Sequence, residues 1–116
     1  MVSNICSRLL RKVWREYDTD DIPHIEGIYV IGVIHPFTET EVVYVGRSND
    51  IHRRMVEHRS QDLAIDRFVQ EMFQENGGED LRVKWIEEDD QERREHDYIE
   101  CIADKEGRWP KYNIRG

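Results

Sequence analysis

Two runs of β-branched and aromatic residues predict a β-hairpin. Residues 27–34 read Gly-Ile-Tyr-Val-Ile-Gly-Val-Ile, residues 41–45 read Glu-Val-Val-Tyr-Val, and the polar segment 35–40 joins them. Two such runs with a short connection are typical of paired antiparallel strands. Apolar and basic residues alternate over residues 81–85, which predicts a third strand.

Apolar residues at helical spacing predict four helices around these strands. They cover residues 4–16, a segment from about 51 to 58, residues 62–75, and a segment from about 90 to 104. The order of one helix, two strands, two helices, one strand and one helix is typical of an α+β fold. We therefore expect a small three-stranded antiparallel β-sheet flanked by helices.

Length and composition favour a single globular domain. The 116 residues are 38% hydrophobic and 36% charged, with no internal repeat and no linker rich in Pro, Gly or Ser. No apolar run approaches the ~18 residues of a membrane helix, so we expect no membrane association.

Cys6 and Cys101 are isolated in the sequence. Their isolation argues against a disulfide scaffold or a zinc module, and favours an intracellular protein of the cytoplasm or nucleus, where thiols stay reduced.

The chain is acidic overall but basic in three places. It has 17 Lys and Arg against 25 Asp and Glu, a net charge of -8, yet residues 1–16, 47–60 and 105–116 are each net positive. If these segments converge in the fold, they create a local positive field within the ~8–10 Å over which charges act in salt. The net charge therefore does not exclude a nucleic-acid partner.

Glu95 is out of place on the last predicted helix. The apolar stripe of this helix contains Tyr98, Ile99 and Ile102, and Glu95 extends it by three to four residues toward the N-terminus. A carboxylate at the edge of a buried stripe needs a cation, hydrogen bonds or a paired arginine. Glu100 lies about 140° further around the helix and should face solvent. A structural ion pair and a bound metal both remain open for Glu95.

Arg54 and His58 form a second unusual pair. They are four residues apart on a predicted helix, next to its packed face. A guanidinium beside an imidazole suits an anion such as phosphate, although a solvated basic helix is the alternative. Tyr29 and Tyr44 lie within the two strands of the predicted hairpin, where tyrosines are usually half-buried packing residues.

Taken together, six positions resemble the GIY-YIG nuclease family. Residues 27–29 read Gly-Ile-Tyr and residues 44–46 read Tyr-Val-Gly, similar to the two tripeptides that name the family. The match continues at Arg54, ten residues after the second tyrosine, at His58 four residues later, at Glu95 in Glu-His-Asp-Tyr-Ile, and at Asn113 in Pro-Lys-Tyr-Asn. The resemblance covers residues 27–113.

The resemblance implies an endonuclease that hydrolyses DNA phosphodiester bonds with a single divalent metal. Glu95 would hold Mg²⁺ (or Mn²⁺), which tolerates one protein carboxylate because it keeps several waters. Arg54 would stabilise the charge of the phosphate. Tyr29 would be the general base, with Tyr44 positioning the water or sharing that role, and His58 would relay the proton. Because a phenol has a pKa of ~10, nearby cations are expected to lower it.

The family resemblance also implies supporting roles for five further residues. Asn113 would fix a backbone or tyrosine geometry, and generic contacts to phosphate are expected from Arg47, Arg53, Arg59 and Lys111. The acidic body predicts weak non-specific DNA affinity that falls steeply with salt. We therefore expect specificity to come from DNA shape, such as branches or flaps, or from a protein partner.

Residues 1–26 lie outside the resemblance, and we divide the chain into an N-terminal helical extension, 1–26, and a nuclease domain, 27–116. The extension carries a basic stripe that is either a solvated helix face or a contact for a partner.

No separate DNA-recognition domain follows Asn113, so we expect a free-standing nuclease or the nuclease domain of a longer protein. The stretch from Glu95 to Asn113 is longer than in many family members, which keeps Glu100 as an alternative metal ligand.

Three interpretations of the sequence compete. The first is a metal-dependent DNA endonuclease. The second is a member of the same fold that has lost catalysis and binds nucleic acid or protein. The third is an unrelated small interaction domain. Because no motif position is missing from the sequence, the first interpretation is preferred. DNA cleavage separates it from the other two, and nucleic-acid binding separates the second from the third.

Overall fold

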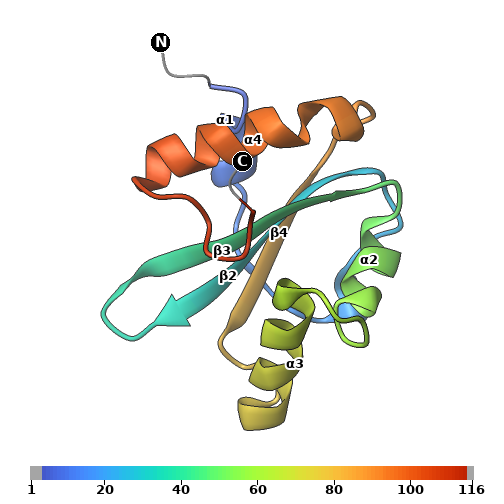
Figure 1. Ribbon diagram of the computed structural model, residues 1–116, viewed down its shortest axis with the longest axis vertical. Coiled ribbons are helices and arrows are strands. Elements are labelled where there is room, and N and C mark those ends of the chain that lie inside the picture. Colours follow the sequence, from blue (N-terminus) through green and yellow to red (C-terminus); the bar gives the residue numbers. More distant parts are fainter. Residues whose placement is uncertain (1–3, 115–116) are drawn as a thin grey trace.

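The computed structural model describes residues 4–114 and places four strands in one antiparallel sheet (Figure 1). The strands are β1 (Arg15–Glu16), β2 (Gly27–His35), β3 (Thr38–Ser48) and β4 (Leu81–Glu87), in the order β1-β4-β2-β3. β2 pairs with both β3 and β4, and β3 forms one edge of the sheet. The predicted α+β class and the hairpin are confirmed, and the sheet has four strands instead of three.

The helices of the sheet region begin and end close to where the sequence predicts them. They are α2 (Ile51–Glu57), α3 (Ala64–Asn76) and α4 (Gln91–Glu106). The carboxylate of Asp50 caps α2 by accepting a hydrogen bond from the Arg53 amide, and Gly77 ends α3 in the left-handed conformation. Within residues 4–114, no helix is long and apolar enough to cross a lipid bilayer.

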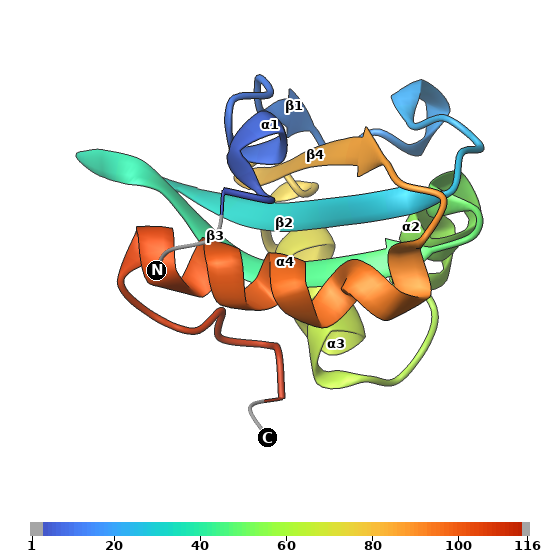
Figure 2. The ribbon, with the colours of Figure 1, turned by 90° about the horizontal axis from the view of Figure 1, so that it is seen from above.

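Helices cover both faces of the sheet, α4 on one side and α2 with α3 on the other (Figures 1 and 2). Because side chains alternate along a strand, β2 contributes to both layers. Ile28 and Val30 pack with Ile102 of α4, whereas Tyr29 and Ile31 pack with residues of α2 and α3. The two apolar layers together form the core of the molecule.

A bulge in β3 turns two consecutive side chains toward the α2–α3 face. The register of β2 against β3 shifts between Ile31 and Gly32, which leaves Val43 without a partner in β2. As a result Val43 and Tyr44 both pack with Tyr29. Bulges commonly re-aim a side chain in this way: Tyr44 lies opposite Ile31 and so shares the face of Tyr29, and the bulge adds Val43 to that face.

The prediction of one continuous helix over residues 4–16 is wrong. Only α1 (Ser7–Leu10) is helical, Arg15–Glu16 pairs with β4 as β1, and a 3-10 turn, η1 (Thr19–Asp21), follows. Leu9 is buried on the α4 face of the sheet, whereas Tyr17 is buried on the opposite face. One continuous helix cannot present both residues to opposite faces, so the chain instead passes around the β1 edge of the sheet.

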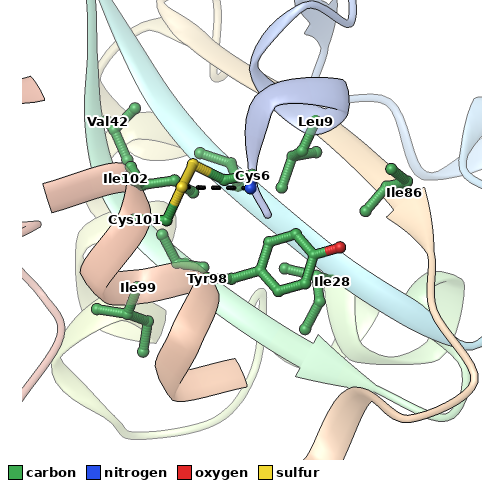
Figure 3. Close-up of a cluster of buried hydrophobic side chains, with 11 residues drawn as sticks. Cys6, Leu9, Ile28, Val42, Ile86, Tyr98, Ile99, Cys101 and Ile102 are labelled. Atoms are coloured by element: carbon green, nitrogen blue, oxygen red, sulfur yellow. Dashed lines mark hydrogen bonds between the residues drawn. A yellow bond between two sulfur atoms is a disulfide. The ribbon is translucent and has the colours of Figure 1, made fainter. Parts of the chain in front are cut away.

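The expectation of unpaired cysteines is also wrong, because Cys6 and Cys101 form a disulfide with a Cα–Cα distance of 5.9 Å. Figure 3 shows the bond inside the apolar layer under α4, with the Cys6 amide donating to Sγ of Cys101 at 3.2 Å. The isolation of the two cysteines in the sequence conceals this pairing. Disulfides persist in oxidising surroundings, so the pairing removes the ground on which the sequence favoured a reducing compartment.

Candidate functional site

A buried chain of hydrogen bonds links β2, α2 and α3. The hydroxyl of Tyr29 on β2 lies 2.7 Å from Nε2 of His58, the residue that follows α2. Nδ1 of the same imidazole lies 2.5 Å from Oδ1 of Asp66, near the start of α3. All three residues have 0% of their surface exposed. Each polar group is therefore satisfied by its neighbour and not by bulk water.

Two glycines allow the backbone to approach this chain closely. A Cβ at Gly46 would collide with the ring and hydroxyl of Tyr29, and with the ring of Tyr44. A Cβ at Gly27 would collide with the carbonyl oxygen of Ile86 on β4. Packing alone therefore requires glycine at both positions, which gives a physical reason for the glycines of the two tripeptides.

Tyr44 is the more accessible of the two phenols. Its ring centroid lies 6.1 Å from that of Tyr29 and 5.7 Å from that of His58. Tyr44 is half-buried, whereas Tyr29 is fully buried. Burial raises the pKa of Tyr44, and the charge of Arg54 offsets this in part. The two phenols are thus neighbours, with Tyr44 on the solvent side.

Arg54 on α2 lies beside the same groups. Its side chain is 15% exposed, and Nη1 lies 3.7 Å from Glu57 Oε1 and 3.8 Å from Asp66 Oδ1. Both distances are too long for hydrogen bonds, and within residues 4–114 this buried Nη1 has no hydrogen-bond partner. The charge of Arg54 lowers the pKa of both Tyr29 and Tyr44. The guanidinium therefore retains donor capacity for an anion next to the phenols.

Of the two side chains expected to lower the pKa of Tyr29 by their positive charge, Arg54 does so and His58 does not. Burial raises the pKa of Tyr29 well above its ordinary value, and Arg54 offsets this only in part. Burial, together with the charge of Arg54, lowers the pKa of His58 to about 4, so the imidazole is neutral near pH 7 and supplies no positive charge. Tyr29 can therefore accept a proton only if its own proton leaves at the same time.

Glu95 lies at the edge of α4, close enough for its charge to raise the pKa of Tyr29 and Tyr44. Its side chain is 30% exposed, and Oε1 lies 3.6 Å from Nε of Arg47 on β3. Burial raises the pKa of Glu95, while Arg47 lowers it. Glu100 instead is exposed to solvent, as expected from its position on the helix. Of the two carboxylates, only that of Glu95 is partly buried and acts on the pKa of the tyrosines.

The donor set at Glu95 fits a lightly coordinated metal ion. Its ion-pair distance to Arg47 exceeds a hydrogen bond, so the carboxylate oxygens keep lone pairs for a cation. Within the part of the chain that the structure describes, no group of three or more His, Cys, Asp or Glu side chains is placed to hold a metal. A cation at Glu95 would therefore use one protein carboxylate, which Mg²⁺ tolerates when water and phosphate oxygens complete its shell.

Asn113 fixes the backbone of β3, as the sequence predicts. Its Oδ1 accepts a hydrogen bond from the Val45 amide and its Nδ2 donates to the Val45 carbonyl, both at 2.8 Å. The amide of Tyr112 donates to the carbonyl of Val43 at 2.9 Å. The segment 112–113 therefore covers the open edge of β3 on both sides of Tyr44, in front of the strand in Figure 1.

The four basic residues expected to contact phosphate lie in different surroundings. Arg47 turns toward α4, where Nε faces Glu95. Arg53 and Arg59 are exposed at α2 and just after it, and Arg59 lies over a phenylalanine ring, 3.7 Å from its centroid. Lys111 is exposed on the segment that covers β3. All four are thus exposed, and Arg47 faces the carboxylate of Glu95.

Asp66 is the site residue that the sequence analysis missed. It lies on α3 three residues before Val69, and both are buried within the apolar side of that helix. The argument that identified Glu95, a carboxylate on an apolar stripe, applies equally to Asp66. The signal was therefore present in the spacing of residues 62–75.

Comparisons of the chain with protein-family models, with curated proteins and with solved structures found no match.

Proposed function

We propose that this chain is a metal-dependent endonuclease that hydrolyses DNA phosphodiester bonds with a tyrosine general base, as its resemblance to the GIY-YIG family implies. One observation carries the proposal. Within residues 4–114, a buried guanidinium nitrogen of Arg54 has no hydrogen-bond partner and lies 3.8 Å from Asp66, at the end of the hydrogen-bond chain from Tyr29 through His58.

Each of these side chains has a role in such a reaction. Hydrolysis of a phosphodiester needs a base for the attacking water and a positive group for the charge that develops on the phosphate. Arg54 supplies the positive group and has an unused donor. The two phenols lie beside it as the base, and neutral His58 accepts the next proton. Asn113 holds the strand that carries Tyr44.

Glu95 would hold the divalent metal, which when bound supplies a Lewis acid for a phosphate oxygen and for the leaving group. The exposed Arg53, Arg59 and Lys111 would contact neighbouring phosphates without reading sequence. Because the whole chain carries a net charge of -8, these contacts give weak and strongly salt-dependent binding. DNA shape, such as a branch or flap, or a protein partner would then provide specificity.

The test is nicking of supercoiled plasmid and of a panel of branched DNAs, with and without Mg²⁺. We expect Mg²⁺-dependent cleavage that Glu95→Ala reduces at least about 100-fold. Glu100→Ala is the matched control, because Glu100 lies on the same helix but is exposed and hydrogen-bonded to His96. Cleavage that survives Glu95→Ala, or that Glu100→Ala abolishes equally, would contradict this assignment.

A second candidate function is a nucleic-acid-binding module without catalysis. The complete burial of Tyr29 and His58 favours it, because a purely structural hydrogen-bond chain would look the same. Such a module would bind branched DNA in the absence of cleavage, and binding would be insensitive to Tyr29→Phe. Failure to cut any DNA of the panel, with binding retained, would select this function over the nuclease.

A further inference from the structure

We propose that Asp66 is a positioning residue that fixes the tautomer of His58 and thereby directs the proton of Tyr29 inward, so that protons leave the site through Tyr44, Tyr29 and His58 in that order. The statement about the tautomer depends only on the geometry of the three buried groups. Its consequence for cleavage rests on the proposed function.

The carboxylate of Asp66 has both oxygens engaged. Oδ1 lies 2.5 Å from Nδ1 of His58, and Oδ2 accepts a hydrogen bond from the Leu63 amide at 2.9 Å. This amide belongs to the N-cap residue of α3, where unpaired donors need an acceptor. An ionised carboxylate only accepts hydrogen bonds. Nδ1 of His58 must therefore carry the proton.

With Nδ1 protonated, a neutral imidazole has Nε2 free as an acceptor. The group in contact with Nε2 is the hydroxyl of Tyr29, at 2.7 Å. A phenol has one proton, so the Tyr29 hydroxyl donates it to Nε2 of His58. The lone pairs of the Tyr29 oxygen remain free to accept a hydrogen bond from another group. The neighbouring phenol is that of Tyr44, whose ring centroid lies 6.1 Å from that of Tyr29, and we infer that its hydroxyl is the donor to this oxygen. The donor direction therefore runs from Tyr44 to Tyr29 to His58 to Asp66.

Burial decides where a proton enters this chain. Tyr29, His58 and Asp66 are 0% exposed, whereas Tyr44 is half-buried. Water therefore reaches the phenol of Tyr44 and not that of Tyr29. This exchanges the roles expected from the sequence, because Tyr44 becomes the group that contacts the attacking water and Tyr29 becomes an internal relay.

The proton transfer balances without any further reactant. Water gives a proton to the oxygen of Tyr44 as the Tyr44 proton moves to Tyr29 and the Tyr29 proton moves to Nε2 of His58. The hydroxide left behind forms the new bond to phosphorus, and the leaving oxygen departs with the electron pair of the broken bond. His58 is then an imidazolium paired with the carboxylate of Asp66.

The charges that face His58 act in opposite directions. Asp66 favours the imidazolium, whereas Arg54 disfavours it and favours a phenolate on Tyr29 or Tyr44. At rest the imidazole is neutral, since burial outweighs Asp66. Asp66 therefore acts first through the tautomer and only transiently as a counter-ion.

Asp66→Asn is the informative substitution, because an asparagine has only one oxygen. If that oxygen keeps the bond to the Leu63 amide, the Nδ2 amide faces Nδ1 of His58 and requires the opposite tautomer, with the proton on Nε2. An Nε2 proton then points at the oxygen of Tyr29 and drives the hydroxyl proton of Tyr29 outward. The size and shape of the side chain stay nearly the same.

The experiment is ¹⁵N NMR of imidazole nitrogens in the wild-type protein and in Asp66→Asn, with His58→Gln to assign the signals among the five histidines. We expect the Nδ1-protonated tautomer in the wild type near pH 7 and the Nε2-protonated tautomer in Asp66→Asn. Asp62→Asn is the matched control, because Asp62 is exposed and paired with Arg67 just before α3. It should leave the His58 signals unchanged.

An Nε2-protonated His58 in the wild type would overturn the proposal even if Asp66→Asn failed to fold. A folded Asp66→Asn with the wild-type tautomer would overturn it as well.

In the cleavage assay, Asp66→Asn and Tyr29→Phe should each lower the rate at least about 10-fold, and Asp62→Asn should not. If the wild type cuts no DNA while the tautomer behaves as expected, the proposed function fails and the positioning role of Asp66 stands. Cleavage that Asp66→Asn leaves intact despite the changed tautomer would refute the relay.

Discussion

The absence of a side chain at Gly46 leaves the space that Tyr29 occupies in the candidate site. The Tyr29 ring and hydroxyl occupy the space where a Cβ would stand, and Tyr29 cannot move aside without losing His58. We expect Gly46→Ala to lower the free energy of unfolding by about 1–3 kcal/mol, the usual cost of overpacking a core. Gly77→Ala is the comparison, because a Cβ there meets no atom within 4 Å and only the left-handed φ opposes it. Denaturant unfolding that finds Gly46→Ala no more costly than Gly77→Ala would contradict this account.

Single residues also show what a sequence can reveal about a site. Glu95 is recognisable because it is a carboxylate on an apolar stripe, and its side chain is partly buried beside Arg47. Asp66 lay on another stripe and was overlooked. The burial of Tyr29 and the lowered pKa of His58 have no local signal, because both depend on how α2 and α3 close over β2.

The segment 112–113 stabilises the edge strand that carries Tyr44. Asn113 satisfies both backbone groups of Val45, which would otherwise face outward from the sheet. Asn113→Ala removes both hydrogen bonds and should lower the free energy of unfolding by about 1–3 kcal/mol. The specific measurement is hydrogen exchange at the Val45 amide, which should become at least about 10-fold faster. Lys111→Ala, an exposed neighbour, serves as control, and unchanged exchange at Val45 in Asn113→Ala would disprove the bracing role.

Elements were predictable where the local pattern and the tertiary packing agree. The hairpin, α3 and β4 each present a regular apolar face to the core, and each was predicted within a few residues. The segment 4–16 has helical spacing, but its apolar residues serve opposite faces of the sheet. Two-residue β1 is too short to leave a pattern, and it forms only because β4 offers it a partner.

For the molecule as a whole, the disulfide joins the N-terminal segment to α4 across 95 residues of sequence. A loop of this length restricts the unfolded chain strongly, and reduction should cost about 2–5 kcal/mol of unfolding free energy. Thermal unfolding with and without reductant measures the effect, and Cys6→Ala combined with Cys101→Ala should be insensitive to reductant. Two reactive thiols in the folded, unreduced protein, or equal midpoints in both conditions, would refute the bond.

The same bond gives the molecule a covalent topology that its linear sequence does not suggest. The sulfur bridge turns residues 6–101 into a closed ring, and every proposed site residue except Lys111 and Asn113 is a member of it. One cut in the backbone, for example at the exposed Phe37 in the hairpin turn, opens the ring without releasing a fragment. A singly nicked molecule would gain only one water and would still hold both halves of the site on one covalent framework.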